Sequence, residues 1–273
     1  MAVDYGIGVS HNRGSDRKTA APSLAAFVRF ARERHTGEFP DGATRQQIAD
    51  SAHISIAYLA KLESGTAESP TATVLRSLAT SMELSPDETQ HLFDLAGRSS
   101  ENVRVPTKSP LTVAEYRAMV DPDVQMTYQA VNPHLVALLD ERWNVLVCND
   151  SYRKAYPGLM DSTNVLSWFF TDPRSRQVMV DWEKEATLTV GWFRGLSARY
   201  QDSQWSHSVL DELSGVEEFQ QMWSRNHVIF GRDDPWMSLR NDDGTTYTVW
   251  VNIYGTSMQG HQLQLFTGVR REP

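Results

Sequence analysis

Residues 44–65 read TRQQIADSAHISIAYLAKLESG, and their apolar spacing predicts two short helices that meet at a tight turn. Thr44 and Gln47 have the spacing of a capping box, which begins the first helix by satisfying its free backbone amides. Ile48 and Ala49 then face inward, and the small Ala49 side chain lets two helices cross closely. This pattern predicts a helix-turn-helix.

The second helix of the pair follows a turn at residues 52–54, with Ser55 as its N-cap. Leu59 and Leu62 recur on one face of this helix and point into the domain. The residues that face away are Ile56, Ala57, Ala60 and Lys61. In a helix-turn-helix this second helix enters the major groove of DNA. The alternative interpretation is an ordinary helical hairpin packed in a core.

In a helix that binds the major groove, some exposed residues contact bases and others contact phosphates. The residues expected to approach base edges are Ser55, Ile56, Ala57 and Lys61, of which the apolar pair suits thymine methyl groups. Arg45 and Tyr58 are expected to hold phosphates. The full set expected to bind DNA is Thr44, Arg45, Gln46, Ser55, Ile56, Ala57, Tyr58 and Lys61. Because one short helix buries little surface, we expect a homodimer on a two-fold duplex operator.

Five short segments of this stretch carry a family resemblance: Ile48-Ala49, Ile54-Ser55, Tyr58-Leu59, Leu62-Glu63 and Gly65. They resemble the lambda-repressor-like helix-turn-helix regulators of the xenobiotic-response-element type. His53 stands where that family usually has glycine, although histidine tolerates the positive φ of such a turn. Arg45 replaces a common glutamine, which suits a phosphate contact. The resemblance implies DNA binding.

With 273 residues the chain has room for about two domains, and a hydrophobic content of 40% is typical of a globular protein. Residues 1–110 carry 12 basic and 13 acidic side chains, whereas residues 111–273 carry 14 and 21. DNA affinity must therefore come from a local cationic face rather than from net charge. The cations expected on that face are Arg29, Arg32, Arg34, Arg45 and Lys61.

No run of about 18 apolar residues occurs, and the polar first residues lack the apolar core of a signal peptide. We therefore expect a cytoplasmic, nucleoid-associated protein that does not enter a membrane. The single cysteine, Cys148, excludes an intrachain disulfide and a cysteine-cluster metal site.

Changes in the hydrophobic pattern divide the chain into four segments. They are a flexible arm over 1–21, a five-helix DNA-binding domain over 22–97, a linker over 98–111 and a second domain over 112–273. Ser85 and Glu88 form a second capping box, with Pro86 at the first helical position.

The second domain is predicted to be an α+β domain with an antiparallel sheet of the PAS type. A β-hairpin is expected over 135–149, and one long helix is expected from Pro173 to about Ala198. Two shorter helices follow, the second beginning at a capping box from Ser214 to Glu217. The last strand-like runs are 227–230 with 235–240, then 247–254, then 263–269.

Three phrases of this domain carry a second resemblance: LLDERWNVLVCND at 138–150, NVLSWFFTDPRSR at 164–176 and LSGVEEFQQMWSRNHV at 213–228. In this order and spacing they are similar to the MmyB-like ligand-binding domain that often follows a lambda-repressor-like domain in bacterial regulators. That family has a PAS-like fold. The resemblance implies an apolar pocket for a fatty-acid-like or other small hydrophobic ligand.

All eight tryptophans lie after residue 140, within the second domain. Plain core packing is the simplest interpretation of most of them. Aromatic residues from three helices that face one sheet can also line a ligand cavity, and the candidates are Trp168, Phe169, Trp192, Phe193 and Trp223. Arg194 and His227 are candidates for a ligand carboxylate; the alternative is structural pairing with Asp181 or Glu218.

Catalytic motifs are missing: no nucleotide-binding glycine pattern, no HExxH and no GxSxG occurs. We therefore expect no catalytic residue, no metal and no cofactor other than a bound fatty acid or similar molecule. The leading hypothesis is a transcription regulator that senses a small apolar ligand. One alternative is a regulator whose second domain only dimerises or docks a partner, and another is an enzyme fused to a DNA-binding module.

Overall fold

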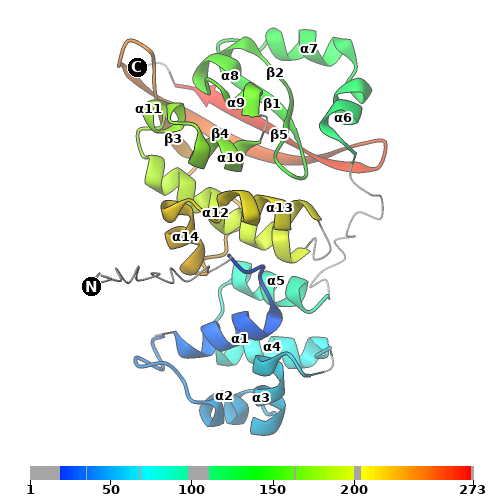
Figure 1. The fold of residues 1–273 in the computed structure, drawn as a ribbon, viewed down its shortest axis with the longest axis vertical. Helices are drawn as coiled ribbons and strands as arrows, with labels where there is room; N and C mark the ends of the chain where they lie inside the picture. The colour runs from blue at the N-terminus through cyan, green and yellow to red at the C-terminus, as the bar shows by residue number, and fades with distance from the viewer. Residues whose placement is uncertain are drawn as a thin grey trace, which may run out of the picture.

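The computed structural model describes residues 19–34, 36–67, 69–97, 111–162, 164–199 and 204–271. Figure 1 shows two lobes along the long axis: helices α1–α5 form one end, and a β-sheet with its helices forms the other. Helices α12–α14 lie between these ends. Most of the expected arm over 1–21 and nearly all of the expected linker over 98–111 lie outside the described residues.

The five helices of the first lobe form where the sequence predicts them. They are α1 Leu24–Glu33, α2 Arg45–Ser51, α3 Ile56–Ser64, α4 Ala72–Ser81 and α5 Pro86–Leu95. One core joins them, and among its fully buried side chains are Val28, Ile48, Leu59, Leu75 and Leu92. The helical fold class of this lobe is confirmed.

Local hydrogen bonds set the ends of these helices. The Thr44 side chain accepts from the Gln47 backbone while the Gln47 side chain accepts from the Thr44 backbone, and Ser85 and Glu88 do the same at α5. In the turn between α2 and α3, His53 has a φ of 54°. Histidine therefore adopts the left-handed conformation that this turn needs.

The second lobe is an antiparallel five-stranded sheet with the strand order β2-β1-β5-β4-β3. Its strands are β1 Leu135–Asp140, β2 Val145–Cys148, β3 Trp236–Arg240, β4 Thr246–Met258 and β5 His261–Arg270. Its helices are α6 Val113–Met119, α7 Pro122–Gln129, α8 Asp150–Ala155, α9 Leu159–Ser162, α10 Val165–Thr171, α11 Arg174–Val178, α12 Trp182–Arg199, α13 Gln204–Leu213 and α14 Glu217–Ser224. This is the PAS-like α+β architecture that the sequence predicts.

The two faces of the sheet have separate cores. On one face, Tyr116 of α6 packs with Leu138 and Leu146 in a small cluster. The other face holds a much larger core, which includes Trp168 of α10 and Phe266 of β5. Among the described residues, no helix has the length and apolarity needed to cross a membrane.

The long helix expected over 173–198 is in fact two helices. Met179 follows α11 in an extended conformation and forms a β-bridge with Leu239 of β3, and the Val180 N–H donates to the Ser238 carbonyl. Pairing with the edge strand takes up backbone groups that a continuous helix would use, so the helix resumes only at α12.

Two other local predictions for this lobe are wrong. Residues 227–230 form no strand, because Val228 and Phe230 pack on the core of the first lobe instead of joining the sheet. Ser214 does not cap α14: its hydroxyl donates to the Asp211 carbonyl at the end of α13, and the N-cap is Val216, without a side-chain hydrogen bond.

Candidate DNA-binding and ligand-binding sites

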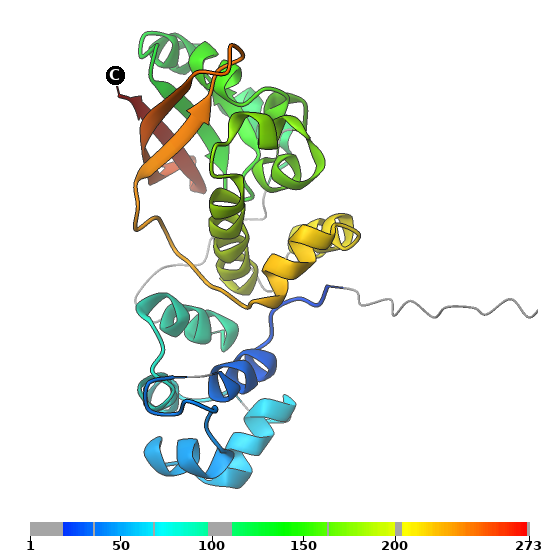
Figure 2. The ribbon, with the colours of Figure 1, turned by 90° about the vertical axis from the view of Figure 1, so that its left-hand side faces the viewer.

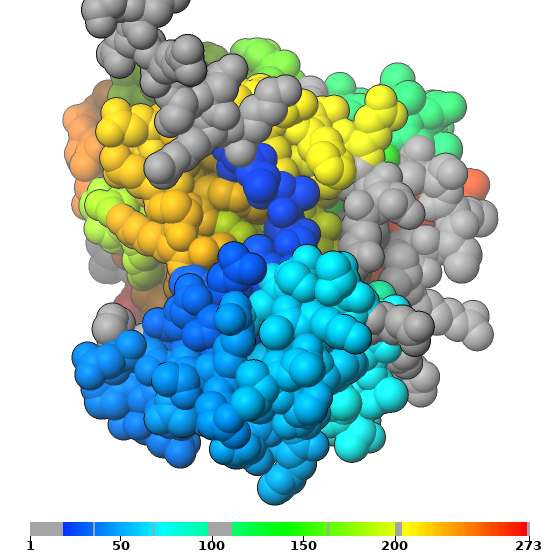
Figure 3. Space-filling model, turned by 60° about the horizontal axis from the view of Figure 1, so that its bottom comes forward, coloured from blue at the N-terminus to red at the C-terminus, as the bar shows by residue number. Residues whose placement is uncertain are grey.

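Helices α2 and α3 lie at the free end of the first lobe, away from the sheet (Figure 1), and this end faces the viewer in Figure 3. Of the residues expected to bind DNA, those exposed here are Thr44, Arg45, Gln46, Ser55, Ile56, Ala57 and Lys61. Tyr58 is half-buried and packs against the core of the lobe. The structure thus leaves seven of the eight expected residues exposed on the two helices at this end.

Thr44 and Ser55 act as helix caps, and two longer side chains of this set also have partners within the chain. Arg45 Nε donates to Glu63 Oε2 at 2.8 Å, and Gln46 Nε2 donates to Asp50 Oδ1 at 2.7 Å. The Arg45 side chain remains 47% exposed. Its two Nη groups have no partner in the part of the chain that the structure describes, so a phosphate can approach them from outside.

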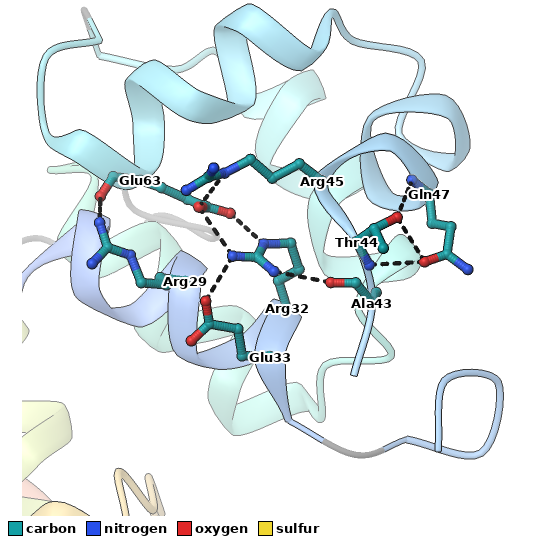
Figure 4. A network of polar contacts seen from close by, with 8 residues as sticks. All are labelled: Arg29, Arg32, Glu33, Ala43, Thr44, Arg45, Gln47 and Glu63. Carbon is teal, nitrogen blue, oxygen red and sulfur yellow. Dashed lines mark hydrogen bonds and ion pairs between the residues drawn. The ribbon is translucent and has the colours of Figure 1, made fainter. Parts of the chain in front are cut away.

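The buried carboxylate of Glu63 joins α1, α2 and α3 (Figure 4). Arg32 of α1 donates to both Glu63 oxygens, at 2.5 and 3.2 Å, and also to the Ala43 carbonyl; Arg29 donates to the Glu63 carbonyl. Burial acts to raise the pKa of Glu63, but the hydrogen bonds from Arg32 and Arg45 outweigh it and hold this pKa below its usual value. The network sets the angle between α3 and the other two helices.

Two cations expected on the DNA-binding face have structural roles instead. Arg32 is buried in the network around Glu63. Arg34 is half-buried, pairs with Glu88 of α5 and donates to the Met82 carbonyl. The guanidinium groups of both residues are thus engaged by partners within the lobe rather than held out toward a phosphate.

A cavity lies between the sheet and helices α10 and α12 of the second lobe. About 760 Å³ of space there is free of protein atoms, a volume that includes the open mouth of the cavity. Three of the expected aromatic residues line it: Trp168 and Phe169 from α10 and Trp192 from α12. Strand residues such as Val251 and Phe266 form the opposite wall.

Helix α12 presents one face to the cavity, formed by Glu185, Leu188, Thr189 and Trp192. Steps of three and four residues keep these side chains on one side of the helix. At about 100° per residue, these four residues span roughly 100° of the helix circumference, and Phe193 and Arg194 fall outside that arc.

The other expected ligand-binding residues lie away from the cavity. Phe193 packs against Trp205 and Trp223. The Arg194 guanidinium lies 3.9 Å from the centre of the Trp223 ring and donates to the Trp223 carbonyl. His227 is exposed. The expectation that Arg194 or His227 holds a ligand carboxylate therefore does not fit this cavity.

A charged pair at the cavity has no counterpart in the sequence-based prediction. Arg232 Nη1 donates to Glu185 Oε2 at 2.6 Å, and Nη2 donates to Oε1 at 2.9 Å. Burial acts to lower the pKa of Arg232, but the hydrogen bond to Glu185 raises it overall. Glu185 could have been predicted from the sequence, because it lies on the same face of the helix as Trp192. Its partner Arg232 could not, because it is 47 residues away in the sequence.

The two lobes meet where α5 packs against α12. Arg199 at the end of α12 pairs with Asp94 of α5 at 3.3 Å. Ala198 and Val228 of the second lobe are buried in the core of the first. Helix α12 thus contacts both the cavity and the DNA-binding lobe.

Residues 228–232, which we call the strap, form a second connection between the lobes. Figure 2 shows the chain before β3, in orange, extending from the sheet to the level of α5. The Phe230 N–H donates to Asp87 Oδ2 of α5 at 2.9 Å, and its ring packs on the core of the first lobe. Gly231 and Arg232, the next two residues, line the cavity.

Two glycines of α12 make room for the strap. A Cβ atom at Gly195 would lie 2.4 Å from the Phe230 ring, and one at Gly191 would lie 3.3 Å from Ile229. Their spacing of four residues places both on one face of the helix. Helix and strap are therefore in direct contact along this face.

His91 of α5 is buried near the contact between the lobes. Its ring packs edge-on against Phe27, with the centroids 4.9 Å apart, and Nδ1 has no hydrogen-bond partner among the described residues. Burial, with the nearby charge of Arg194 as a smaller cause, lowers the pKa of His91 from 6.5 to about 3. The ring is therefore neutral in the folded protein.

Two family models match the chain. A helix-turn-helix domain model matches residues 23–92, which include all five helices of the first lobe except the end of α5. The model of the MmyB-like transcription regulator ligand binding domain matches residues 120–269, more than half of the chain and the part that contains the cavity. No curated protein matches. The chain is a DNA-binding transcription regulator with a ligand-binding domain, and it belongs to the MmyB-like family of such regulators.

Proposed function

We propose that this regulator acts in the cytoplasm as a homodimer on a two-fold operator, and that a small, apolar, fatty-acid-like molecule in the cavity changes its DNA affinity. One observation carries the proposal: the cavity wall and the contact with the DNA-binding lobe are built from the same two elements, α12 and the strap. A change at the cavity therefore has a short path to α5.

The energetics are compatible with an acyl-like ligand. Each buried methylene contributes about 0.8 kcal/mol, so several are enough for micromolar affinity after the cost of association. Affinity alone changes no equilibrium, however, because a ligand must bind one arrangement of the lobes better than another. Trp192 on α12 and Gly231 in the strap would contact the ligand directly, which makes the arrangement of these elements sensitive to occupancy.

On the DNA side, the proposal keeps the division of roles expected from the sequence. Ser55, Ile56, Ala57 and Lys61 approach base edges, and Arg45 and Tyr58 hold phosphates. Thr44 and Gln46 lie beside them at the start of α2. Since α3 has only 9 residues, two copies in half-sites about one helical turn apart would supply the affinity that one lacks.

Replacing Arg45 by alanine is expected to weaken binding to all DNA sequences alike and to reduce the slope of log K against log salt by about one unit. The reason is the loss of one phosphate contact, which carries no base information. Fluorescence anisotropy with operator and random duplexes over a range of salt concentrations measures both effects.

Arg176→Ala is the matched control. Arg176 is 48% exposed and pairs with Glu218 at 2.9 Å, and Arg45 is 47% exposed and pairs with Glu63 at 2.8 Å; Arg176 lies in the second lobe, and its partner is exposed whereas Glu63 is buried. This control should leave the salt slope unchanged. A change in sequence preference at constant salt slope in Arg45→Ala would contradict the phosphate role.

Filling the cavity with a ten-carbon chain, as decanoate or 1-decanol, is expected to change operator affinity about tenfold in the wild-type protein, within the usual range of coupling free energies. In Gly195→Ala the same occupancy should change it less than about twofold, because the new Cβ displaces Phe230 and loosens the strap from α5. Native mass spectrometry reports occupancy, and anisotropy reports operator affinity.

Gly215→Ala is the control for this experiment, since a Cβ there meets nothing within 4 Å. If occupancy of the cavity still changes the operator affinity of Gly195→Ala as it does in wild type, the strap does not transmit the effect, although the sensor function stands. Wild-type operator affinity that stays constant despite proven occupancy would instead exclude the sensor function for this class of ligand.

The second candidate function is a ligand-free dimerisation or docking domain. Exposed side chains on β4 and β5 favour it: Trp250 is 42% exposed, Tyr254 54% and Val269 46%. Trp250 pairs across the strands with Val269, so these two lie side by side on the sheet face opposite the cavity. The occupancy experiment above separates the two functions.

A further inference from the structure

We propose that the cavity selects ligands whose polar group is uncharged, such as a long-chain alcohol, ketone, ester or amide, over free fatty acids. The inference rests on the proposed function, in that it assumes an apolar chain in the cavity. It concerns the polar end of that ligand, which the size of the cavity alone does not determine.

The charged side chains that line the cavity neutralise each other. Glu185 and Arg232 form a two-point pair with side chains only 5% and 11% exposed. The remaining Arg232 contacts are Nε to the Asp234 carbonyl at 3.2 Å and Nη2 to the Trp236 carbonyl at 3.4 Å. Among the lining residues that the structure describes, no cation is left without a carboxylate.

A free fatty acid would therefore enter at an electrostatic disadvantage. A carboxylate that entered the cavity with its chain would lose water without gaining an unpaired cation, because Arg232 already pairs with Glu185. Burial of an unpaired charge is among the largest costs in a protein interior. An alcohol of equal length has the same apolar chain without this cost.

The cavity also offers uncharged hydrogen-bonding groups. Tyr152 is buried and lines the cavity, and its hydroxyl has no hydrogen-bond partner among the described residues. Within the described ranges, the Tyr156 hydroxyl has only the weak acceptor Met237 Sδ, at 3.3 Å. Burial raises the pKa of both phenols well above the usual value, so both keep the proton that they can donate. A ligand hydroxyl or carbonyl oxygen would satisfy such a donor.

The test compares 1-decanol with decanoate on the full chain at pH 7.5, below the aggregation limit of each, with binding followed by tryptophan fluorescence and calorimetry. Decanol is expected to bind at least about tenfold more tightly than decanoate. Decanoate that binds as tightly as decanol, or more tightly, would overturn the inference and leave the proposed sensor function standing. Binding of neither molecule would overturn both.

Two variants test which residues cause the preference for decanol over decanoate. Glu185→Gln leaves Arg232 without its carboxylate, so the preference for decanol over decanoate should fall about tenfold or more. Tyr152→Phe removes only the unpaired hydroxyl and should weaken decanol more than decanoate. Thermal melts confirm that each variant folds, and the wild-type comparison decides the inference even if Glu185→Gln does not fold. A decanol preference that neither variant changes would overturn the assignment to these residues.

Discussion

Replacing Glu63 by alanine is expected to lower the free energy of unfolding of the DNA-binding lobe by about 3–5 kcal/mol, the usual cost of breaking a buried ion pair by removing one partner. The Glu63 carboxylate accepts three hydrogen bonds, two from Arg32 and one from Arg45. Arg32 is itself buried, so its guanidinium would lose its main counter-ion and gain little water. Since a small domain has only about 5–15 kcal/mol of stability, operator binding should also be lost or greatly reduced.

Glu33→Ala separates this buried role from a general effect of charge. Glu33 also accepts from Arg32, at 2.8 Å, but its side chain is 56% exposed, and exposed pairs are worth about 0–1 kcal/mol. Urea unfolding, monitored by hydrogen exchange of the backbone amides in α2 and α3, measures the free energy of unfolding of both variants. Similar losses in the two variants would show that burial of Glu63 is not what stabilises α3.

The second large effect is an acid sensitivity due to His91. Below pH 6.5 the unfolded chain takes up a proton at this residue, whereas the folded protein does not until about pH 3. The unfolded state therefore binds more protons in this window, and the free energy of unfolding falls by about 1.4 kcal/mol for each unit of decreasing pH. Between pH 7.5 and 5.0 the contribution of His91 is about 2 kcal/mol.

His91→Leu should remove this contribution because leucine keeps a buried apolar contact with Phe27 and cannot be protonated. Urea unfolding at pH 7.5 and 5.0 should show a wild-type loss larger than that of His91→Leu by about 2 kcal/mol. His227→Leu, at an exposed histidine, should behave like wild type. Equal pH dependence in wild type and His91→Leu would mean that the ring of His91 is protonated without unfolding.

The sequence by itself determined the features that depend on neighbours three or four residues apart. The capping boxes at Thr44 and Ser85 were predictable because the side chain and the backbone amide that it satisfies lie in the same helical turn. The turn at His53 followed from the limits on backbone conformation. Strand alternation and turn residues likewise predicted most of the antiparallel sheet.

The site residues were less predictable, because a one-dimensional pattern does not say which face of a helix meets which partner. Trp192 and Phe193 are adjacent and equally apolar, yet one lines the cavity and the other packs against Trp205 and Trp223. Only the position of α12, with the cavity on one side and α13 and α14 on the other, separates them.

Contacts between residues far apart in the sequence decided the features that the sequence did not predict. Met179 interrupts the expected helix because a backbone partner on β3 competes with the helical hydrogen bonds. Residues 227–230 have a strand-like sequence but pack between the lobes, since burial of Val228 and Phe230 in the first lobe replaces burial in a sheet. Arg232 and Glu185, which form an ion pair, are 47 residues apart in the sequence. No local pattern predicts this pair, because the attraction between two charges depends on their distance in space and not on their separation along the chain.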